Sequence, residues 1–276
     1  MINIEKLHFS YSTKKPLFSE LGMELKPGKV YGLLGKNGTG KSSLLKLIVG
    51  AIFAKRGQVS VDGTDSTKRD PKVLSDLFFL SENYHTPALK IKDYVAANGP
   101  MYPKFDKDKF YSFLEIFEID VDSNLEHLSY GQRKKVVISF AIATNAKYLL
   151  LDEPTNGLDI PSKSQFRKAL LSGFQEDQIV IISTHQIRDL NQLIESIIII
   201  EEGKILFHKD VFELEEKLLF TKTLSEDSDV NVLYSEMVPG GYIHIQSNPN
   251  NEPSEVELEV LFNAIVQNKT SFNQYF

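Results

Sequence analysis

One short glycine-rich stretch constrains the fold of this chain more than any other. Residues 35–42 read Gly-Lys-Asn-Gly-Thr-Gly-Lys-Ser and match the pattern G-x-x-x-x-G-K-[ST]. The apolar run 30–34 before it predicts a buried strand, and residues 43–49 after it carry apolar side chains at helical spacing and end at Gly50. This order aims backbone N–H groups and a helix amino terminus at one spot, which suits it to bind phosphate. We therefore expect an α/β fold that binds a nucleoside triphosphate at this loop.

The residue types within the loop support this interpretation. Glycines let the backbone approach phosphates without side-chain clashes. Lys41 is expected to reach the β- and γ-phosphates, and the Ser42 hydroxyl to bind Mg²⁺. The alternative is a glycine-rich turn that caps an ordinary helix, and the strand before the loop argues against it.

Composition excludes several classes of protein. The chain has 276 residues, enough for one large or two small domains, and its net charge of −6 argues against a nucleic-acid surface over the whole molecule. It has no cysteine, which excludes disulfides, thiolate metal sites and a cysteine nucleophile. No signal peptide is visible, and the most apolar run, residues 197–200, is far shorter than the ~20 residues that a spanning helix needs. Work at a membrane would therefore require another chain to supply the spans.

Polar side chains follow two further apolar runs. Asp152 and Glu153 come directly after residues 148–151, which places Asp152 to hold Mg²⁺ through water and Glu153 to act as a general base on an attacking water. The alternative, a pair of solvated loop acids, is disfavoured by the apolar run before them. His185 follows the predicted strand 179–182, at the strand end where ligands gather in an open α/β sheet.

Two other stretches allow both a structural and a functional interpretation. Tyr11 lies in a turn after the first strand, where it would either stack on a flat base or remain a half-buried tyrosine. Ser129 and Gly131 precede a helix predicted over 133–143, where they would cap that helix or form a second phosphate site. We interpret the basic residues 133–135 as a solvated face rather than a nucleic-acid patch.

The chain also changes character along its length. Antiparallel strands are expected before the glycine loop, and residues 91–128 predict a helical, aromatic-rich insert whose rings form a small core, or in part dock a partner. A helix over 211–220 closes the main body. Beyond it, strands at 230–233 and 242–245 and a helix over 255–267 predict a small appendage that needs another surface to pack on.

Four motifs in a fixed order identify a family resemblance. LSYGQ at 128–132, LLLDEP at 149–154, GLD at 157–159 and STH at 183–185 together resemble the ATP-binding cassette (ABC) ATPases over residues 2–220. The resemblance implies a P-loop NTPase (RecA-like) core with an N-terminal antiparallel β subdomain and an α-helical subdomain at about 84–145. We therefore expect a cassette domain over 1–220 and a small α+β appendage, of β-β-α order, over 221–276.

The resemblance also implies roles for individual residues around ATP and Mg²⁺. Tyr11 is the adenine-stacking aromatic, Asp152 the acid on the Mg²⁺ side, Glu153 the catalytic base and His185 the γ-phosphate switch. The residues implied to hold the phosphates are Gly35, Asn37, Gly38, Thr39, Gly40, Lys41, Ser42 and Ser43.

Other positions relate to a second subunit or depart from the family pattern. Ser129, Gly131 and Gln132 are implied to contact the ATP held by the other subunit, and Asp159 to couple the two sites. Tyr130 stands where glycine is usual. Glu82 stands where the family has a glutamine that contacts Mg²⁺ and the attacking water, so its oxygens are the candidate replacement.

The same resemblance implies partners. One phosphate loop and one LSYGQ signature in the chain mean that a complete site needs two cassettes head to tail, with an identical chain or a paralogue. Such chains resemble the cytoplasmic motor of a membrane transporter: they drive a transmembrane permease subunit from the inner face of the cell membrane. The tail is similar to bacterial half-transporter ATPases of the export type.

Two rival functions exist within the family. Soluble cassette ATPases that act on ribosomes or DNA usually carry two fused cassettes, a coiled-coil arm, zinc cysteines or basic tails, none of which this sequence has, so we expect no nucleic-acid partner. A regulatory cassette that binds ATP without hydrolysing it is disfavoured by Glu153 and His185.

Overall fold

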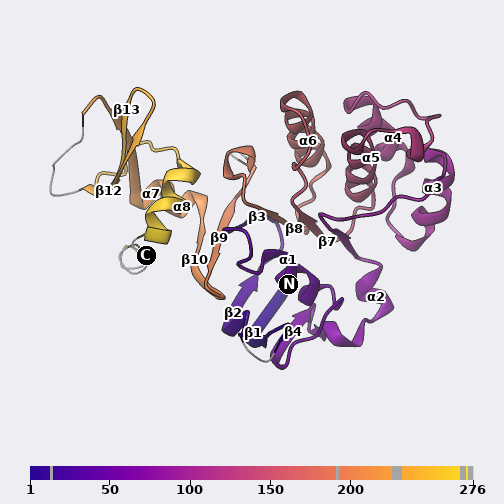
Figure 1. Ribbon diagram of the computed structural model, residues 1–276, viewed down its shortest axis with the longest axis horizontal. Coiled ribbons are helices and arrows are strands. Elements are labelled where there is room, and N and C mark those ends of the chain that lie inside the picture. Colours follow the sequence, from indigo (N-terminus) through magenta and orange to yellow (C-terminus); the bar gives the residue numbers. More distant parts are fainter. Residues whose placement is uncertain (13–14, 191–192, 226–231, 268–271, 273–275) are drawn as a thin grey trace.

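The computed structural model of the protein describes residues 1–12, 15–190, 193–225, 232–267, 272 and 276 (Figure 1). The strands are β1 (Ile2–Phe9), β2 (Phe18–Leu25), β3 (Lys29–Leu34), β4 (Arg56–Val61), β5 (Thr64–Asp65), β6 (Leu77–Leu80), β7 (Tyr148–Asp152), β8 (Ile179–Thr184), β9 (Ser196–Glu201), β10 (Lys204–Asp210), β11 (Leu218–Thr223), β12 (Val232–Val238) and β13 (Gly241–Ser247). The α-helices are α1 (Lys41–Ile48), α2 (Pro71–Leu74), α3 (Ile91–Asn98), α4 (Lys107–Ile116), α5 (Tyr130–Ala143), α6 (Ile160–Gly173), α7 (Val211–Lys217) and α8 (Leu258–Gln267).

A six-stranded sheet of order β10-β9-β3-β8-β7-β6 forms the centre of the molecule. The strands β9, β3, β8, β7 and β6 run parallel to their neighbours, and only the edge strand β10 is antiparallel to β9. Parallel sheets are covered on both faces, which is why their strands read as near-continuous apolar runs in the sequence. The predicted P-loop NTPase core is therefore confirmed.

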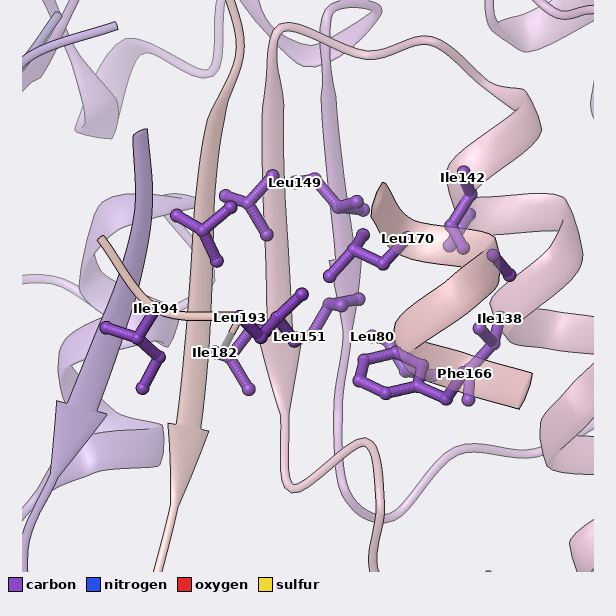
Figure 2. Packing of buried hydrophobic residues seen from close by; sticks show 14 of the residues in the cluster. Leu80, Ile138, Ile142, Leu149, Leu151, Phe166, Leu170, Ile182, Leu193 and Ile194 are labelled. Atoms are coloured by element: carbon purple, nitrogen blue, oxygen red, sulfur yellow. The ribbon is translucent and has the colours of Figure 1, made fainter. Parts of the chain in front are cut away.

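The two faces of this sheet contribute to two different hydrophobic cores. Alternate residues of a strand point to opposite faces. Val30 and Leu34 of β3 pack on the side of α5 and α6, whereas Tyr31 and Leu33 pack on the side of α1. Figure 2 shows the first core, in which Phe166 and Leu170 of α6 lie against the sheet beside Leu151.

A four-stranded antiparallel sheet of order β2-β1-β4-β5 covers the other side of α1. Apolar residues of α1, such as Leu44 and Ile48, share one core with Ile2 and Ile4 of β1 and with Ile181 of β8. The helix that follows the glycine loop is therefore held between two sheets (Figure 1). This arrangement confirms the predicted N-terminal antiparallel β subdomain.

The aromatic-rich insert folds as the helices α3 and α4 and packs on α5. The ring of Phe140 in α5 lies 4.9 Å from the ring of Phe105 and 5.2 Å from that of Tyr94. The aromatic side chains singled out in this insert are buried or half-buried in the same core: Tyr94, Tyr102, Phe105, Phe110, Tyr111, Phe113 and Phe117. Of the two interpretations of these rings, the structure therefore supports a structural core.

The carboxyl-terminal segment differs from the sequence prediction in one element. Helix α7 ends at Lys217, and residues 218–223 form strand β11 where the sequence predicted a helix to residue 220. The pairing of β11 with β13, with Leu218 opposite Ser247, satisfies backbone groups that a helix would have used internally. A three-stranded antiparallel sheet of order β11-β13-β12 results, so the appendage has one strand more than predicted. Val230, in the first strand predicted there, lies outside the described residues.

Helix α8 then packs back on the body of the molecule (Figure 1). Among the described residues, no helix is both long enough and apolar enough to cross a membrane.

Candidate functional site

The site lies at the carboxyl ends of three adjacent parallel strands. Strand β3 pairs with β8, and β8 pairs with β7, in parallel register. The glycine loop follows β3, Glu153 follows β7, and His185 follows β8. Because the carboxyl ends of parallel strands meet at one edge of a sheet, residues far apart in the sequence come together here.

A cleft of about 670 Å³ opens at this edge. Its lining residues are Tyr11, Leu17, Asn37, Gly38, Gly40, Lys41, Ser42, Ser43, Glu82, Glu153, Asn156 and His185. Most residues that the sequence predicted around ATP therefore line one cavity.

The glycine loop wraps around the amine of Lys41. This side chain is buried, and its Nζ donates hydrogen bonds to the carbonyl oxygens of Gly35 at 2.7 Å and Lys36 at 3.2 Å. Burial lowers the pKa of Lys41, and the carboxylates of Glu153, Asp152 and Glu82 act in the opposite direction. Gly35 itself does not line the cleft, and its carbonyl group holds the amine of Lys41, which does.

Two further loop residues show why the sequence is constrained here. Thr39 Oγ1 donates to the Lys36 carbonyl oxygen at 2.9 Å and closes the loop on itself. Gly40 has a φ of +106°, and a Cβ added to it would lie 2.6 Å from the ring of Phe18. Only glycine satisfies both the left-handed backbone and the close approach.

The acid at the end of β7 is held by hydroxyl groups. Asp152 is buried, and its Oδ1 accepts hydrogen bonds from Ser42 Oγ at 3.0 Å and from Ser183 Oγ. A serine hydroxyl beside a carboxylate, at a loop that binds phosphate, is the hard-oxygen donor set that Mg²⁺ prefers together with substrate oxygens. Within the described part of the chain, no group of three or more His, Cys, Asp or Glu side chains is arranged to hold a metal by itself. Ser42 and Asp152 therefore fit a Mg²⁺ whose other ligands include oxygens of a bound triphosphate.

Glu153 is oriented by the end of β8. Its backbone adopts a left-handed φ of +48°, and its side chain is buried. Thr184 Oγ1 donates to Oε2 at 2.9 Å, while Oε1 lies 2.8 Å from His185 Nδ1 and accepts from the His185 backbone N–H at 3.1 Å. The carboxylate is thus held in one orientation at the cleft.

The rim of the cleft carries Tyr11 and Glu82. Tyr11 is 68% exposed, its hydroxyl lies 3.0 Å from Ser43 Oγ, and its ring packs edge-on against Phe9 at 4.8 Å. Asn156 Nδ2 donates to Glu82 Oε1 at 3.1 Å, which ties Glu82 to the turn that follows Glu153. The ring of Tyr11 is therefore open to a flat ligand.

The LSYGQ residues lie outside this cleft. Ser129 and Gln132 form a reciprocal capping box at the start of α5, with hydrogen bonds of 3.2 and 2.9 Å, and both are exposed. Gly131 packs near the carbonyl oxygen of Gly157. Asp159 is an exposed cap of α6 that accepts from the Ser162 N–H at 2.9 Å. Helix α5 starts at Tyr130, earlier than predicted, because this capping box begins it.

One basic residue was interpreted wrongly from the sequence. Lys134 is fully buried rather than part of a solvated face, and its Nζ donates to the carbonyl oxygens of Glu153 and Asn156. A signal for this existed: Lys134 precedes the buried Ile138 and Ile142 at intervals of four residues, so all three share one face of α5. Asn156 was also missed, although it follows Glu153 closely.

Comparisons with known proteins agree with this geometry. The family model for ABC transporters matches residues 18–156. The ABC transporter ATP-binding protein YtrB of Bacillus subtilis is 27% identical over 238 residues, which cover 86% of this chain and 80% of YtrB. The methionine import ATP-binding protein MetN of Carboxydothermus hydrogenoformans is 30% identical over 221 residues, or 75% of this chain and 65% of MetN.

A solved structure extends the comparison to three dimensions. A putative ABC transporter ATP-binding protein from Pyrococcus furiosus superposes with a TM-score of 0.59 at 30% identity, over 67% of this chain and 91% of that one. The motif order, the cleft and these matches lead to the same conclusion: the chain belongs to the ABC transporter family, as an ATP-binding and ATP-hydrolysing subunit whose activity is coupled to transport.

Proposed function

We propose that this chain pairs head to tail with a second cassette, an identical chain or a paralogue, around two ATP molecules and drives a separate transmembrane permease. One observation carries this proposal. The cleft gathers the phosphate loop, Glu153 and His185, while Ser129 and Gln132 lie exposed and outside it. In a dimer with two-fold symmetry, the LSYGQ residues of each copy would face the cleft of the other copy. Such a dimer contains two equivalent sites, each built from both chains.

In this proposal the cleft binds ATP from base to γ-phosphate. Tyr11 stacks on the adenine, and the loop from Gly35 through Asn37, Gly38, Thr39 and Gly40 surrounds the phosphates with backbone N–H groups. Lys41 reaches the β- and γ-phosphates by leaving the carbonyl groups that it contacts in the free loop, and Ser43 supports the phosphate side.

Ser42, Asp152 and Glu82 are the residues that would hold Mg²⁺. When bound, Mg²⁺ supplies neutralisation of the negative charge that develops on the transferred phosphate. Glu82 offers a carboxylate oxygen in place of the amide oxygen usual in the family. Its position in the cleft, fixed by Asn156, supports this role.

Glu153 is the general base of hydrolysis in this account. It accepts a proton from the attacking water as the water oxygen bonds to the γ-phosphorus, and the bond from that phosphorus to the β–γ bridging oxygen breaks. His185 uses Nδ1 toward Glu153, which leaves Nε2 for the γ-phosphate. Thr184 keeps the carboxylate from turning away.

The partner subunit completes each site. Ser129, Gly131 and Gln132 of one copy contact the γ-phosphate held by the other, where the start of α5 presents a positive helix end. Asp159 lies at the start of α6, in the segment that would pass between the two sites, and couples them.

The permease partner follows from membership of the ABC transporter family. Among the described residues no helix could cross a membrane. We place this chain in the cytoplasm, on the inner face of the cell membrane, with no nucleic-acid partner. We propose export as the direction, on the resemblance of the tail to export-type ATPases, although a methionine import protein is among the relatives.

The test is a pull-down of tagged chain carrying Glu153→Gln from detergent-solubilised cells in ATP and Mg²⁺. Removal of the base should slow hydrolysis by about 10²–10⁴-fold and preserve the ATP-bound assembly. Glu153→Gln combined with Lys41→Ala is the matched control, because it removes the phosphate contact and should release the partner subunit.

Enrichment of one multi-spanning membrane protein together with a second cassette subunit is the expected result, and the control should lose the second cassette subunit. Recovery of ribosomes or nucleic acid without a membrane protein would contradict the proposal and favour a soluble ATPase of the same family.

A further inference from the structure

A buried lysine links the LSYGQ helix to the turn that carries the catalytic carboxylate. Lys134 in α5 is 0% exposed. A buried ammonium must find polar partners, because leaving it unpaired in the interior is strongly unfavourable. Lys134 Nζ finds them in two backbone carbonyl oxygens, that of Glu153 at 2.6 Å and that of Asn156 at 2.8 Å.

These two carbonyl groups belong to the same turn. The turn begins at Glu153, whose left-handed φ of +48° is unfavourable for a residue with a Cβ and persists only where the surroundings hold it. On one side the Glu153 N–H donates to the Ser183 carbonyl oxygen of β8 at 3.0 Å. On the other side Lys134 donates to two carbonyl groups of the turn, and the Asn156 side chain donates to Glu82.

The first turn of α5 packs against the same segment. The ring of Tyr130 faces Gly157, where an added Cβ would come within 2.8 Å of it, and Lys134 Nζ lies 5.7 Å from the centre of that ring. A displacement of the start of α5 would therefore also displace this turn.

The charges around Lys134 suit this position. Burial lowers the pKa of Lys134 to about 8, and the carboxylates of Glu82, Glu153 and Asp152 favour its charged form. The amine thus keeps its proton at neutral pH and offers three donors, of which the turn uses two.

We propose that Lys134 is a positioning residue that ties the start of α5 to the turn carrying Glu153. When the neighbouring subunit's ATP engages Ser129, this tie transmits the shift to the catalytic carboxylate of the same chain. The first part concerns the isolated chain, and the second rests on the proposed function. The two parts are tested by separate measurements.

The first measurement is amide hydrogen exchange of the nucleotide-free chain. Lys134→Met keeps an apolar stem of similar length but removes both hydrogen bonds, so the amides of residue 153 and residues 155–158 should exchange at least about tenfold faster. Lys135→Met is the matched control, because Lys135 Nζ lies against Phe117, 3.5 Å from its carbonyl oxygen and 6.0 Å from the centre of its ring. Unchanged exchange in Lys134→Met would overturn the proposal.

Lys134→Gln provides a second variant in case the methionine impairs folding. The glutamine side chain is shorter and reaches at most part of the two carbonyl acceptors, Glu153 and Asn156. The amide exchange rates of this variant should therefore lie between those of the wild type and Lys134→Met. Exchange in Lys134→Gln equal to that of the wild type would also contradict the tie.

The second measurement is steady-state ATP hydrolysis with ATP binding measured in parallel. Misplacement of a catalytic group by about 1 Å costs about 100-fold in rate, so kcat of Lys134→Gln should fall by up to that factor while the Kd for ATP stays within about threefold. A normal kcat together with a loosened turn would overturn the transmission. A wild-type chain that bound ATP without hydrolysing it would refute the proposed function and leave the exchange test standing.

Discussion

Tyr11 is an exposed residue to which we assign the stacking of the adenine base. Its ring is held edge-on by Phe9 and stands free at the rim of the cleft. Stacking of a base on an aromatic ring is worth about 1–3 kcal/mol, so Tyr11→Ala should raise the Kd for ATP about tenfold or more and leave kcat nearly unchanged. Isothermal titration calorimetry measures this directly.

Tyr11→Phe is the matched control for that prediction. It keeps the ring and loses only the hydroxyl that lies 3.0 Å from Ser43 Oγ, so ATP binding should stay close to that of the wild type. Equal affinity in Tyr11→Ala would mean that the ring does not contact the nucleotide.

Glu82 stands where the family has a glutamine, so substitution of Glu82 tests whether the site requires the negative charge of the carboxylate. Glu82→Gln keeps the oxygen that accepts from Asn156 and removes a negative charge near the triphosphate. We expect its ATPase rate to stay within a few-fold of the wild type. A loss of more than about tenfold, roughly 1.4 kcal/mol, would show that the charge itself is required. Glu82→Ala, which lacks any oxygen, should be the more impaired variant.

The sequence predicts the position of a site residue best where its neighbours in the site are contiguous with it in the chain or follow an adjacent parallel strand. The loop residues are contiguous, and Asp152 and Glu153 follow a strand whose apolar run is plain in the sequence. Lys134 was misjudged because its partners are carbonyl groups of a distant turn, and a backbone acceptor leaves no mark in the residue types. Its spacing of four and eight residues from Ile138 and Ile142 was the mark of its burial in the sequence.

At the scale of elements, α5 serves as the centre of the helical insert. The ring of Phe140 faces the rings of five aromatic neighbours, Phe78, Tyr94, Tyr102, Phe105 and Phe110, at 4.9–6.3 Å. Phe140→Ala should lower the free energy of unfolding by about 3–5 kcal/mol, since it leaves a cavity in a dense core. Urea denaturation monitored by circular dichroism measures the change.

Phe53→Ala is a suitable control, because Phe53 is 54% exposed and its loss should change the free energy of unfolding by no more than about 0.5 kcal/mol. A cost below about 1 kcal/mol for Phe140→Ala would contradict the central position assigned to this ring.

Strand β11 explains why the tail was harder to predict than the core. Residues 211–220 carry apolar and acidic residues at helical spacing, and the helix does form, but only to Lys217. The helix ends there because residues 218–223 pair with β13. In the sequence, β12 separates these residues from β13. Long-range pairing overrides local propensity, whereas the parallel core strands are marked by their own apolar runs.

At the scale of the whole molecule, the appendage shares the main hydrophobic core. Leu261 of α8 is fully buried in the same cluster as Phe207 of β10 and Leu214 of α7. Arg188, just after the site residue His185, also forms an ion pair with Glu259 of α8. The carboxyl-terminal segment is therefore built onto the body beside the site.

Leu261→Ala should lower the free energy of unfolding of the whole chain by about 2–5 kcal/mol, in a single transition that also abolishes ATP binding. The exposed Leu224→Ala is the control and should leave the transition unchanged. Two separate transitions, with ATP binding lost only in one, would instead show that the appendage unfolds independently.

The central claim is that each active site combines the glycine loop of one copy with the LSYGQ segment of the other. We would mix two inactive variants: Lys41→Ala, which lacks the phosphate contact, and Ser129→Asp, which keeps the helix cap but repels phosphate. A mixed dimer joins the intact loop of the second variant to the intact signature of the first.

The measurement is the ATPase rate of the equimolar mixture. Random exchange makes half of the dimers mixed, each with one intact site of two, so the rate should recover to roughly a quarter of the wild-type value. A mixture as inactive as its components would contradict the head-to-tail site, since it would mean that both segments must be intact in one chain.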